Sequence, residues 1–352
     1  MGKQAQIAVI TSPTGTMHVS GFLEILAALP EVAQVALVTD GADDIEAHAR
    51  EHLGARIAGT YPDVDALFAA FQPELTIVSL EPRTAPPVIA ACLRAGSHVL
   101  AEKPACLQWE EFAELASLAD AQQRNLGLAF AARGFPFLQD ARSLVANGTL
   151  GKLYGVDTYF IADQTRVQQA EWQASWFSQK AYAGGGHLMW LGIHYVDLLH
   201  HLTGQRVVEV AGLTAVVGGA PIDTEDAAVA VLRFEDGMVG TLTSAYYVDR
   251  NKQSHLHLWG SQGWLRGRPN DWESLEWYST HPAEQSAPYR TIRYDTPKSE
   301  VKPTYYGLVR AAVHGAMGIA PHPVATAEAL HVLKVVHAIY RAAETGQTQR
   351  VE

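Results

Sequence analysis

Short apolar segments alternate with segments of helical spacing along the first part of the chain, and this alternation restricts the possible folds more than any other feature. Strands that alternate with helices imply parallel pairing and right-handed crossovers. The pattern therefore predicts that residues 1–131 form an α/β domain built on a doubly wound parallel sheet. The predicted strands of this sheet are residues 7–10, 35–38, 75–78, 99–101 and 126–130.

The pattern changes from Lys152 onward, where the predicted strands are longer and mostly lack intervening helices. Glu235-Asp236-Gly237 between two of them is typical of a hairpin. Consecutive strands without crossover helices favour a mostly antiparallel open sheet, so residues 132–352 are expected to form an α+β domain. A helix at about 326–346 is expected to pack on the first domain or on this sheet. The predicted strands are 153–161, 207–217, 227–234, 239–247 and 255–259.

Composition narrows the classes of partner. The 352 residues carry a net charge of −11, which argues against nucleic acids and anionic membrane surfaces. Two cysteines are too few for a disulfide framework, so a reducing cytoplasm is expected. No signal peptide and no apolar run of membrane-spanning length is visible. An open apolar face of the second sheet is expected to be covered by subunit pairing, which predicts a homo-oligomer, a dimer or tetramer.

The first strand is followed by a turn where doubly wound sheets bind a dinucleotide. This turn, residues 11–16, holds a single glycine, Gly15, so its glycine pattern is poor, but its hydroxyl groups suit phosphate oxygens. A plain tight turn explains the segment equally well. Asp40 follows the second strand, where a carboxylate accepts hydrogen bonds from an adenosine ribose. It favours NAD over NADP, and a helix-capping role for Asp40 is the alternative.

Glu102-Lys103-Pro104 follows the predicted strand 99–101. Lys103 therefore lies at the sheet edge where open α/β folds bind ligands. Pro104 restricts the backbone of Lys103 and is compatible with an unusual peptide geometry. The alternative is a strand-to-helix turn with a solvated lysine.

Three glycines, Gly184 to Gly186, precede a predicted helix in the second half. On this helix His187, Trp190, His194 and Asp197 recur at intervals of three or four residues and share one face. Such a face could line a pocket. In the alternative structural interpretation, His194 and Asp197 satisfy each other in the core.

Together these motifs resemble the glucose-fructose oxidoreductase, inositol dehydrogenase and MocA (Gfo/Idh/MocA) family over nearly the whole length. The resemblance implies an N-terminal Rossmann domain and a C-terminal sheet domain that supplies the substrate pocket and the oligomer contact. Family members use NAD or NADP to oxidise a hydroxyl of a sugar or cyclitol, or to reduce the ketone. The matching segments are Asp40, 97–104, Arg133, 148–152, 184–186, 192–194 with Asp197, and 342–346.

The resemblance implies a role for each matched residue. Lys103 and His194 correspond to the lysine and histidine that lie beside the reacting carbon, and both are expected to be catalytic. The expected cofactor, NAD rather than NADP, is assigned to Thr11, Ser12, Thr14, Gly15, Thr16, Asp40, Leu80, Glu81, Glu102, Lys103 and Arg133. The expected substrate, a carbohydrate or polyol, is assigned to Lys103, Trp190 and His194. Four residues outside the matched motifs are assigned to the same pocket, with ordinary packing as the alternative for each: Tyr159, Trp176, His187 and Tyr246.

Two departures from the family pattern keep alternatives open. Gly15 is alone in the phosphate turn, and Trp190 stands where the family usually has an aspartate. One alternative is a lyase or glycosidase that acts through a keto sugar, with metal assistance, although no strong metal-ligand pattern is found. The other is a catalytically silent sensor or binding protein.

Overall fold

The computed structural model describes residues 4–15, 18–269, 274–295 and 303–351. The chain divides into two compact units. Unit 1 comprises residues 1–131 and 299–330, and unit 2 comprises residues 132–298 and 331–352. Among the described residues, none of the helices combines the length and the apolar character needed to cross a membrane.

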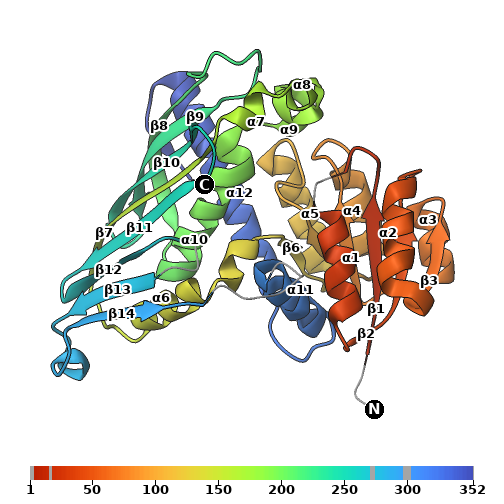
Figure 1. Cartoon of the computed structure of the whole chain (residues 1–352), viewed down its shortest axis with the longest axis horizontal. Coiled ribbons are helices and arrows are strands. Elements are labelled where there is room, and N and C mark those ends of the chain that lie inside the picture. The colour runs from red at the N-terminus through yellow and green to blue at the C-terminus, as the bar shows by residue number, and fades with distance from the viewer. Residues whose placement is uncertain (1–3, 16–17, 270–273, 296–302, 352) are drawn as a thin grey trace. The chain divides into compact units, whose positions relative to one another are not determined.

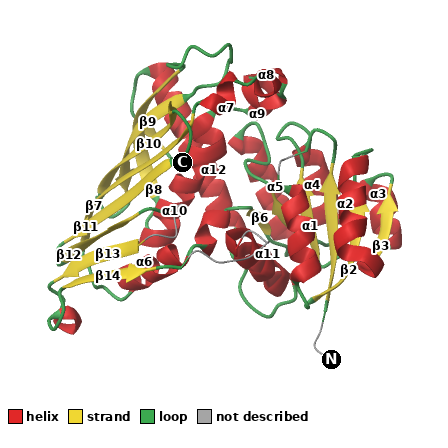
Figure 2. Cartoon of the chain, in the orientation of Figure 1, coloured by secondary structure: helices red, strands yellow, loops and turns green. Residues whose placement is uncertain are grey.

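Unit 1 contains a six-stranded parallel sheet in the order β3-β2-β1-β4-β5-β6. This confirms the predicted doubly wound sheet, because the strand order reverses direction between β1 and β4. The sequence pattern does not predict β3, a half-buried edge strand that lacks a continuous apolar run. Figures 1 and 2 show the sheet between its helices. The strands are β1 (Ala5–Thr11), β2 (Val32–Val38), β3 (Ile57–Tyr61), β4 (Leu75–Ser79), β5 (His98–Ala101) and β6 (Leu126–Leu128).

Two groups of helices cover this sheet. α1 (Val19–Ala28) packs against α2 (Asp43–Leu53) and α11 (Pro303–Ala316). α4 (Ala85–Arg94) packs against α3 (Val64–Ala70) and α5 (Trp109–Ala121). The core between helices and sheet is built from fully buried aliphatic and aromatic side chains, including Ile7, Phe22 and Phe112.

Unit 2 contains a nine-stranded sheet in the order β14-β13-β12-β11-β7-β10-β9-β8-β15. Its neighbours are antiparallel except for the parallel pair β7 and β10, so the predicted mostly antiparallel sheet is confirmed. The sequence pattern does not predict β12 to β15. The strands are β7 (Leu153–Asp163), β8 (Val207–Ala215), β9 (Ala227–Phe234), β10 (Val239–Val248), β11 (Gln253–Gly260), β12 (Gly263–Gly267), β13 (Ser274–Ser279), β14 (Tyr289–Arg293) and β15 (Gln349–Arg350).

The helix α10 (Ile193–Thr203) packs on one face of the unit 2 sheet, where Tyr195 stacks on Phe160 of β7 at 5.4 Å between ring centroids. A π-helical turn, Leu188–Gly192, precedes α10. α6 (Pro136–Ala146) packs on α10 and β13, and α12 (Thr326–Thr345) begins in unit 1 and continues in unit 2. Short helices connect β7 to the π-helical turn: α7 (Thr165–Gln168), α8 (Ala170–Ala174) and α9 (Lys180–Ala183).

Candidate active site

The turn after β1 is shaped by Gly15. A Cβ at this position would lie 2.7 Å from the carbonyl oxygen of Ser79 and 2.9 Å from that of Ser12, so only glycine fits. The Gly15 amide donates to the Ser12 carbonyl at 2.8 Å, and the Ser12 and Thr14 hydroxyls lie 3.3 Å apart in an exposed position. Thr16 lies outside the described residues. The backbone therefore passes close to the sheet edge and presents two exposed hydroxyls ahead of α1.

Thr11 differs from its neighbours in this turn. Its hydroxyl is buried and donates to the Ser79 carbonyl at 3.0 Å. This bond ties the end of β1 to the end of β4. The Thr11 side chain is therefore engaged within the sheet, whereas the hydroxyls of Ser12 and Thr14 contact each other in an exposed position.

Asp40 lies at the carboxyl end of β2 and is exposed, with φ of 49°. The helix that follows is capped at Ala42 without a side-chain hydrogen bond, so the alternative in which Asp40 caps α2 is wrong. Aspartate tolerates left-handed backbone better than most residues, and Gly41 continues the turn at φ of 84°. The Asp40 carboxylate therefore lies at the end of β2 and does not cap α2.

Lys103 is buried at the end of β5, with 4% of its surface exposed, so the alternative of a solvated lysine is wrong. The Lys103-Pro104 peptide bond is cis, which is the unusual geometry that the sequence allows. Glu102 precedes it at 2% exposure, and its amide donates to the Val78 carbonyl at 2.8 Å. The backbone of β4 therefore positions Lys103 directly after the sheet.

The carboxylate of Glu102 has partners that the sequence does not reveal. His18 Nδ1 lies 3.0 Å from Glu102 Oε1, and the hydroxyl of Tyr305 from α11 lies 3.2 Å from His18 Nδ1. Burial raises the pKa of Glu102, but the charge and hydrogen bond of His18 and the charge of Lys103 outweigh it, and the net pKa is lowered. Burial and the Glu102 charge raise the pKa of Tyr305 well above its usual value. An ionised carboxylate therefore directly precedes Lys103, and a neutral phenol lies against His18 on the far side of that carboxylate's partner.

Leu80 and Glu81 follow β4 and are both buried. The carbonyl of Glu81 accepts bonds from the amides of Thr84 and Ala85 at the start of α4, and its carboxylate pairs with Arg83 at 3.5 Å. Because β1, β2, β4 and β5 are parallel, their carboxyl ends share one edge of the sheet. The structure thus brings the unit 1 candidates to the edge at which such sheets bind ligands.

In unit 2 the glycine directly before His187, Gly186, is required by Glu225. A Cβ on Gly186 would lie 2.9 Å from the Glu225 amide nitrogen. The Glu225 carboxylate accepts from the amides of Gly186 at 2.6 Å and Leu188 at 2.9 Å, and from the Tyr340 hydroxyl at 2.8 Å. Burial raises the pKa of Glu225 against the effect of these bonds. The close approach of Gly186 is therefore to the Glu225 backbone, and the Glu225 carboxylate binds the amides on either side of His187.

Four of the residues assigned to substrate form two aromatic pairs. His187 packs edge-on against Tyr246 at 4.4 Å, and Trp190 packs edge-on against Trp176 at 5.0 Å. His187 is fully buried, and its Nδ1 lies 2.6 Å from the Ser244 hydroxyl. Burial, with the charge of Arg166, lowers the pKa of His187 to about 3. His187 is therefore a neutral group held between Ser244 and Tyr246.

Tyr159 belongs to neither pair. Along β7, Phe160 faces α10 and contacts His187, so Tyr159 points to the opposite face of the sheet. There it stacks on His255 of β11 at 5.2 Å. The pleat of the strand separates Tyr159 from the other residues assigned to substrate.

Asp197 of α10 is bound by Arg133. The two Arg133 nitrogens Nε and Nη2 donate to the Asp197 carboxylate at 2.5–3.2 Å, and both side chains are buried. The guanidinium that the sequence assigns to the cofactor is thus engaged by an internal carboxylate. His194, one turn earlier on α10, is half-buried.

Two family models match the chain. One, described as an oxidoreductase family with an NAD-binding Rossmann fold, matches residues 6–130. The other, the GFO/IDH/MocA C-terminal domain, matches residues 138–266. Together they cover the segments that carry the unit 1 sheet edge and the π-helical turn with α10.

Individual relatives agree with these matches. The 1,5-anhydro-D-fructose reductase of Ensifer adhaerens is 23% identical over 292 residues, which is 83% of this chain and 81% of the relative. An uncharacterized oxidoreductase of Schizosaccharomyces pombe is 29% identical, but the match spans 47% of this chain and less than half of the relative, 44%. The crystal structure of an oxidoreductase domain protein from Kribbella flavida has a TM-score of 0.86 at 23% identity, covers 100% of both chains and supports the fold.

Proposed function

The chain belongs to the Gfo/Idh/MocA oxidoreductase family, and on that premise we propose that it transfers a hydride between NAD and a secondary hydroxyl or ketone of a sugar, cyclitol or related polyol. The observation that carries the proposal is Lys103, a buried ammonium beside an ionised Glu102 at the carboxyl edge of the Rossmann sheet. The name of the Ensifer relative, a reductase of a sugar, supports the substrate class.

The unit 1 sheet edge fits a dinucleotide. The backbone at Gly15 leaves no room for a side chain, and the exposed Ser12 and Thr14 hydroxyls suit the pyrophosphate. Asp40 is placed for the adenosine ribose hydroxyls. When bound, the nicotinamide accepts or donates the hydride.

Residues of this chain would accept the proton of the alcohol and stabilise the negative charge that develops on its oxygen. Oxidation of a secondary alcohol leaves negative charge on its oxygen as the proton departs. We assign stabilisation of that charge to the Lys103 ammonium, beside a Glu102 carboxylate that His18 holds. We assign proton removal to His194, assisted or replaced by Lys103.

The comparisons do not support the two alternatives. The matching families and the relatives named above are described as oxidoreductases or reductases. A metal-assisted lyase built on His187 is further disfavoured, because His187 Nδ1 is held by Ser244 and the side chain is fully buried.

The proposed function is tested by titrating the purified protein with NAD and NADP, then assaying a panel of sugars and polyols for NADH formation. Failure to bind either dinucleotide would overturn it.

Replacing Asp40 by alanine is expected to weaken NAD binding by about 10–100-fold, the loss of hydrogen bonds to a charged acceptor. NADP binding should be unchanged or tighter, because the carboxylate that repels the extra phosphate is gone. Dissociation constants for both dinucleotides measure this. Asp236→Ala, in the hairpin turn of unit 2, is the control. Equal weakening of NAD and NADP binding would contradict the ribose role.

We also propose that the open face of the unit 2 sheet pairs subunits. Leu213 of β8 and Val229 of β9 are directly opposed and exposed at 72% and 46%, and Val231 is exposed at 54%. A contiguous apolar strip of this kind is a typical interaction surface. Its occupant is proposed to be a second copy of the chain.

Val231→Lys is expected to shift the protein from oligomer to monomer, because pairing would bury two new charges. Light scattering after size-exclusion chromatography measures the mass. Ile319→Lys, which changes an equally exposed apolar residue of unit 1, is the control. A monomeric native protein, or an unchanged mass for Val231→Lys, would contradict the assignment.

A further inference from the structure

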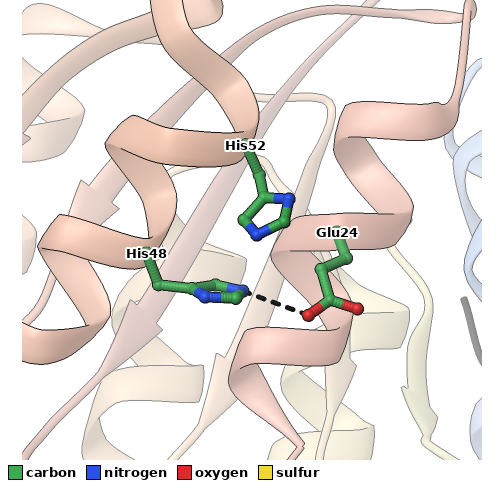
Figure 3. A group of neighbouring side chains, drawn as sticks. All are labelled: Glu24, His48 and His52. Carbon is green, nitrogen blue, oxygen red and sulfur yellow. Dashed lines mark ion pairs between the residues drawn. The ribbon is translucent and has the colours of Figure 1, made fainter. Parts of the chain in front are cut away.

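Three potential metal ligands lie together on neighbouring helices of unit 1, and none of them is assigned to the dinucleotide. Glu24 comes from α1, and His48 and His52 come from α2 (Figure 3). Each can offer a ligand atom such that all three atoms lie within 4.8 Å of one another. His48 and His52 are four residues apart, so they share one face of α2, the face that packs on α1.

The distances between the three side chains are close to those between ligands of one metal ion. Zinc binds imidazole nitrogen and carboxylate oxygen at about 2.0–2.2 Å, so two ligands of a tetrahedral ion lie about 3.4 Å apart. His48 Nε2 already lies 3.3 Å from Glu24 Oε1. The rings of His48 and His52 lie 4.3 Å apart between centroids. Because His52 is exposed, a change of rotamer can bring its nitrogen the remaining distance.

The nitrogen at the centre of the cluster also points to a ligand. His48 Nε2 is buried and has no partner with hydrogen-bond geometry among the described residues, although the Glu24 carboxylate lies close. A buried polar atom without such a partner is uncommon in folded proteins. An ion between the nitrogen and the carboxylate would satisfy both groups.

We propose that Glu24, His48 and His52 bind one Zn²⁺ ion, with solvent in the fourth position. Two imidazoles and one carboxylate suit a transition metal of borderline softness and disfavour Mg²⁺ and Ca²⁺, which prefer oxygen ligands. The ion links α1 to α2. α1 follows the turn at Gly15, and α2 follows the strand end at Asp40. The ion would therefore stabilise the packing of the two helices that follow the segments proposed to hold the dinucleotide. None of its three ligands is a residue assigned to the reaction.

The proposal is tested on the full chain without an affinity tag, after chelator treatment and dialysis. Calorimetric titration with Zn²⁺ is expected to give one equivalent bound, and Co²⁺ should give the visible absorption of a low-symmetry site. His52→Ala is expected to weaken Zn²⁺ binding at least tenfold, since even residues that only orient ligands are worth about 10–100-fold. His281→Ala, in a turn of unit 2, should bind Zn²⁺ like the native chain.

Thermal unfolding separates metal binding from folding. Zn²⁺ should raise the melting temperature of the native chain and of His281→Ala, and at the same Zn²⁺ concentration should raise that of His52→Ala less. Because His52 is exposed, its variant is expected to fold as well as the native chain in the absence of metal. Glu24→Gln, which keeps the shape of the side chain, gives a second test. Absence of stoichiometric binding by the native chain, or undiminished binding by both His52→Ala and Glu24→Gln, would overturn the proposal.

Discussion

The Lys103→Met variant is expected to lose about 10²–10⁴-fold in kcat while its affinity for NAD stays within about threefold of the native value. Methionine keeps an unbranched chain of similar length but lacks the ammonium. Stabilisation of the developing alkoxide would be lost, whereas dinucleotide contacts at Gly15 and Asp40 would remain. Steady-state kinetics and NAD titration on the same preparation measure the two quantities.

Lysine in this position also compensates the buried Glu102, so folding must be monitored. Circular dichroism and thermal unfolding serve this purpose, and Lys103→Arg retains the charge if the methionine variant unfolds. Lys152→Met changes an exposed lysine of unit 2 and should leave kcat unchanged. A folded Lys103→Met variant with native turnover would remove Lys103 from the mechanism.

The position of Lys103 could be predicted from the sequence, but the polar residues grouped at the neighbouring Glu102 could not. The alternation of strands and helices predicts the sheet, and the position after strand β5 predicts that Lys103 reaches its edge. His18 and Tyr305 are separated by 287 positions in sequence, and neither belongs to a motif. Their meeting at Glu102 depends on α11 packing against α1, which a single sequence does not reveal.

The same limit explains the other corrections. The periodicity of His187 and Trp190 predicts a helix, and the structure adds a π-helical turn that periodicity alone does not distinguish. Alternation along β7 implies that Tyr159 and Phe160 face opposite sides, but not which side carries α10. The Zn²⁺ cluster has a visible signal in the spacing of His48 and His52, whereas Glu24 joins them only through the packing of two helices.

Removal of the Arg133 guanidinium is expected to be the most destabilising single change considered. Arg133→Met should lower the free energy of unfolding of unit 2 by about 3–5 kcal/mol, because it leaves the Asp197 carboxylate charged, buried and without its bidentate partner. Urea unfolding followed by tryptophan fluorescence reports mainly this unit, since of the eight tryptophans only Trp109 lies in unit 1.

Two matched variants separate the buried pair from ordinary surface charge. Arg233→Met breaks the exposed pair with Glu209, whose side chains are 57% and 36% exposed, and should cost less than about 1 kcal/mol. The double change Arg133→Met with Asp197→Leu should recover much of the lost stability, because it removes the stranded charge together with its partner. These outcomes would indicate that Arg133 positions α10, and that through α10 it also positions His194. If Arg133→Met were instead as mild as Arg233→Met while NAD affinity fell, the guanidinium would belong to the cofactor site that the sequence resemblance implies.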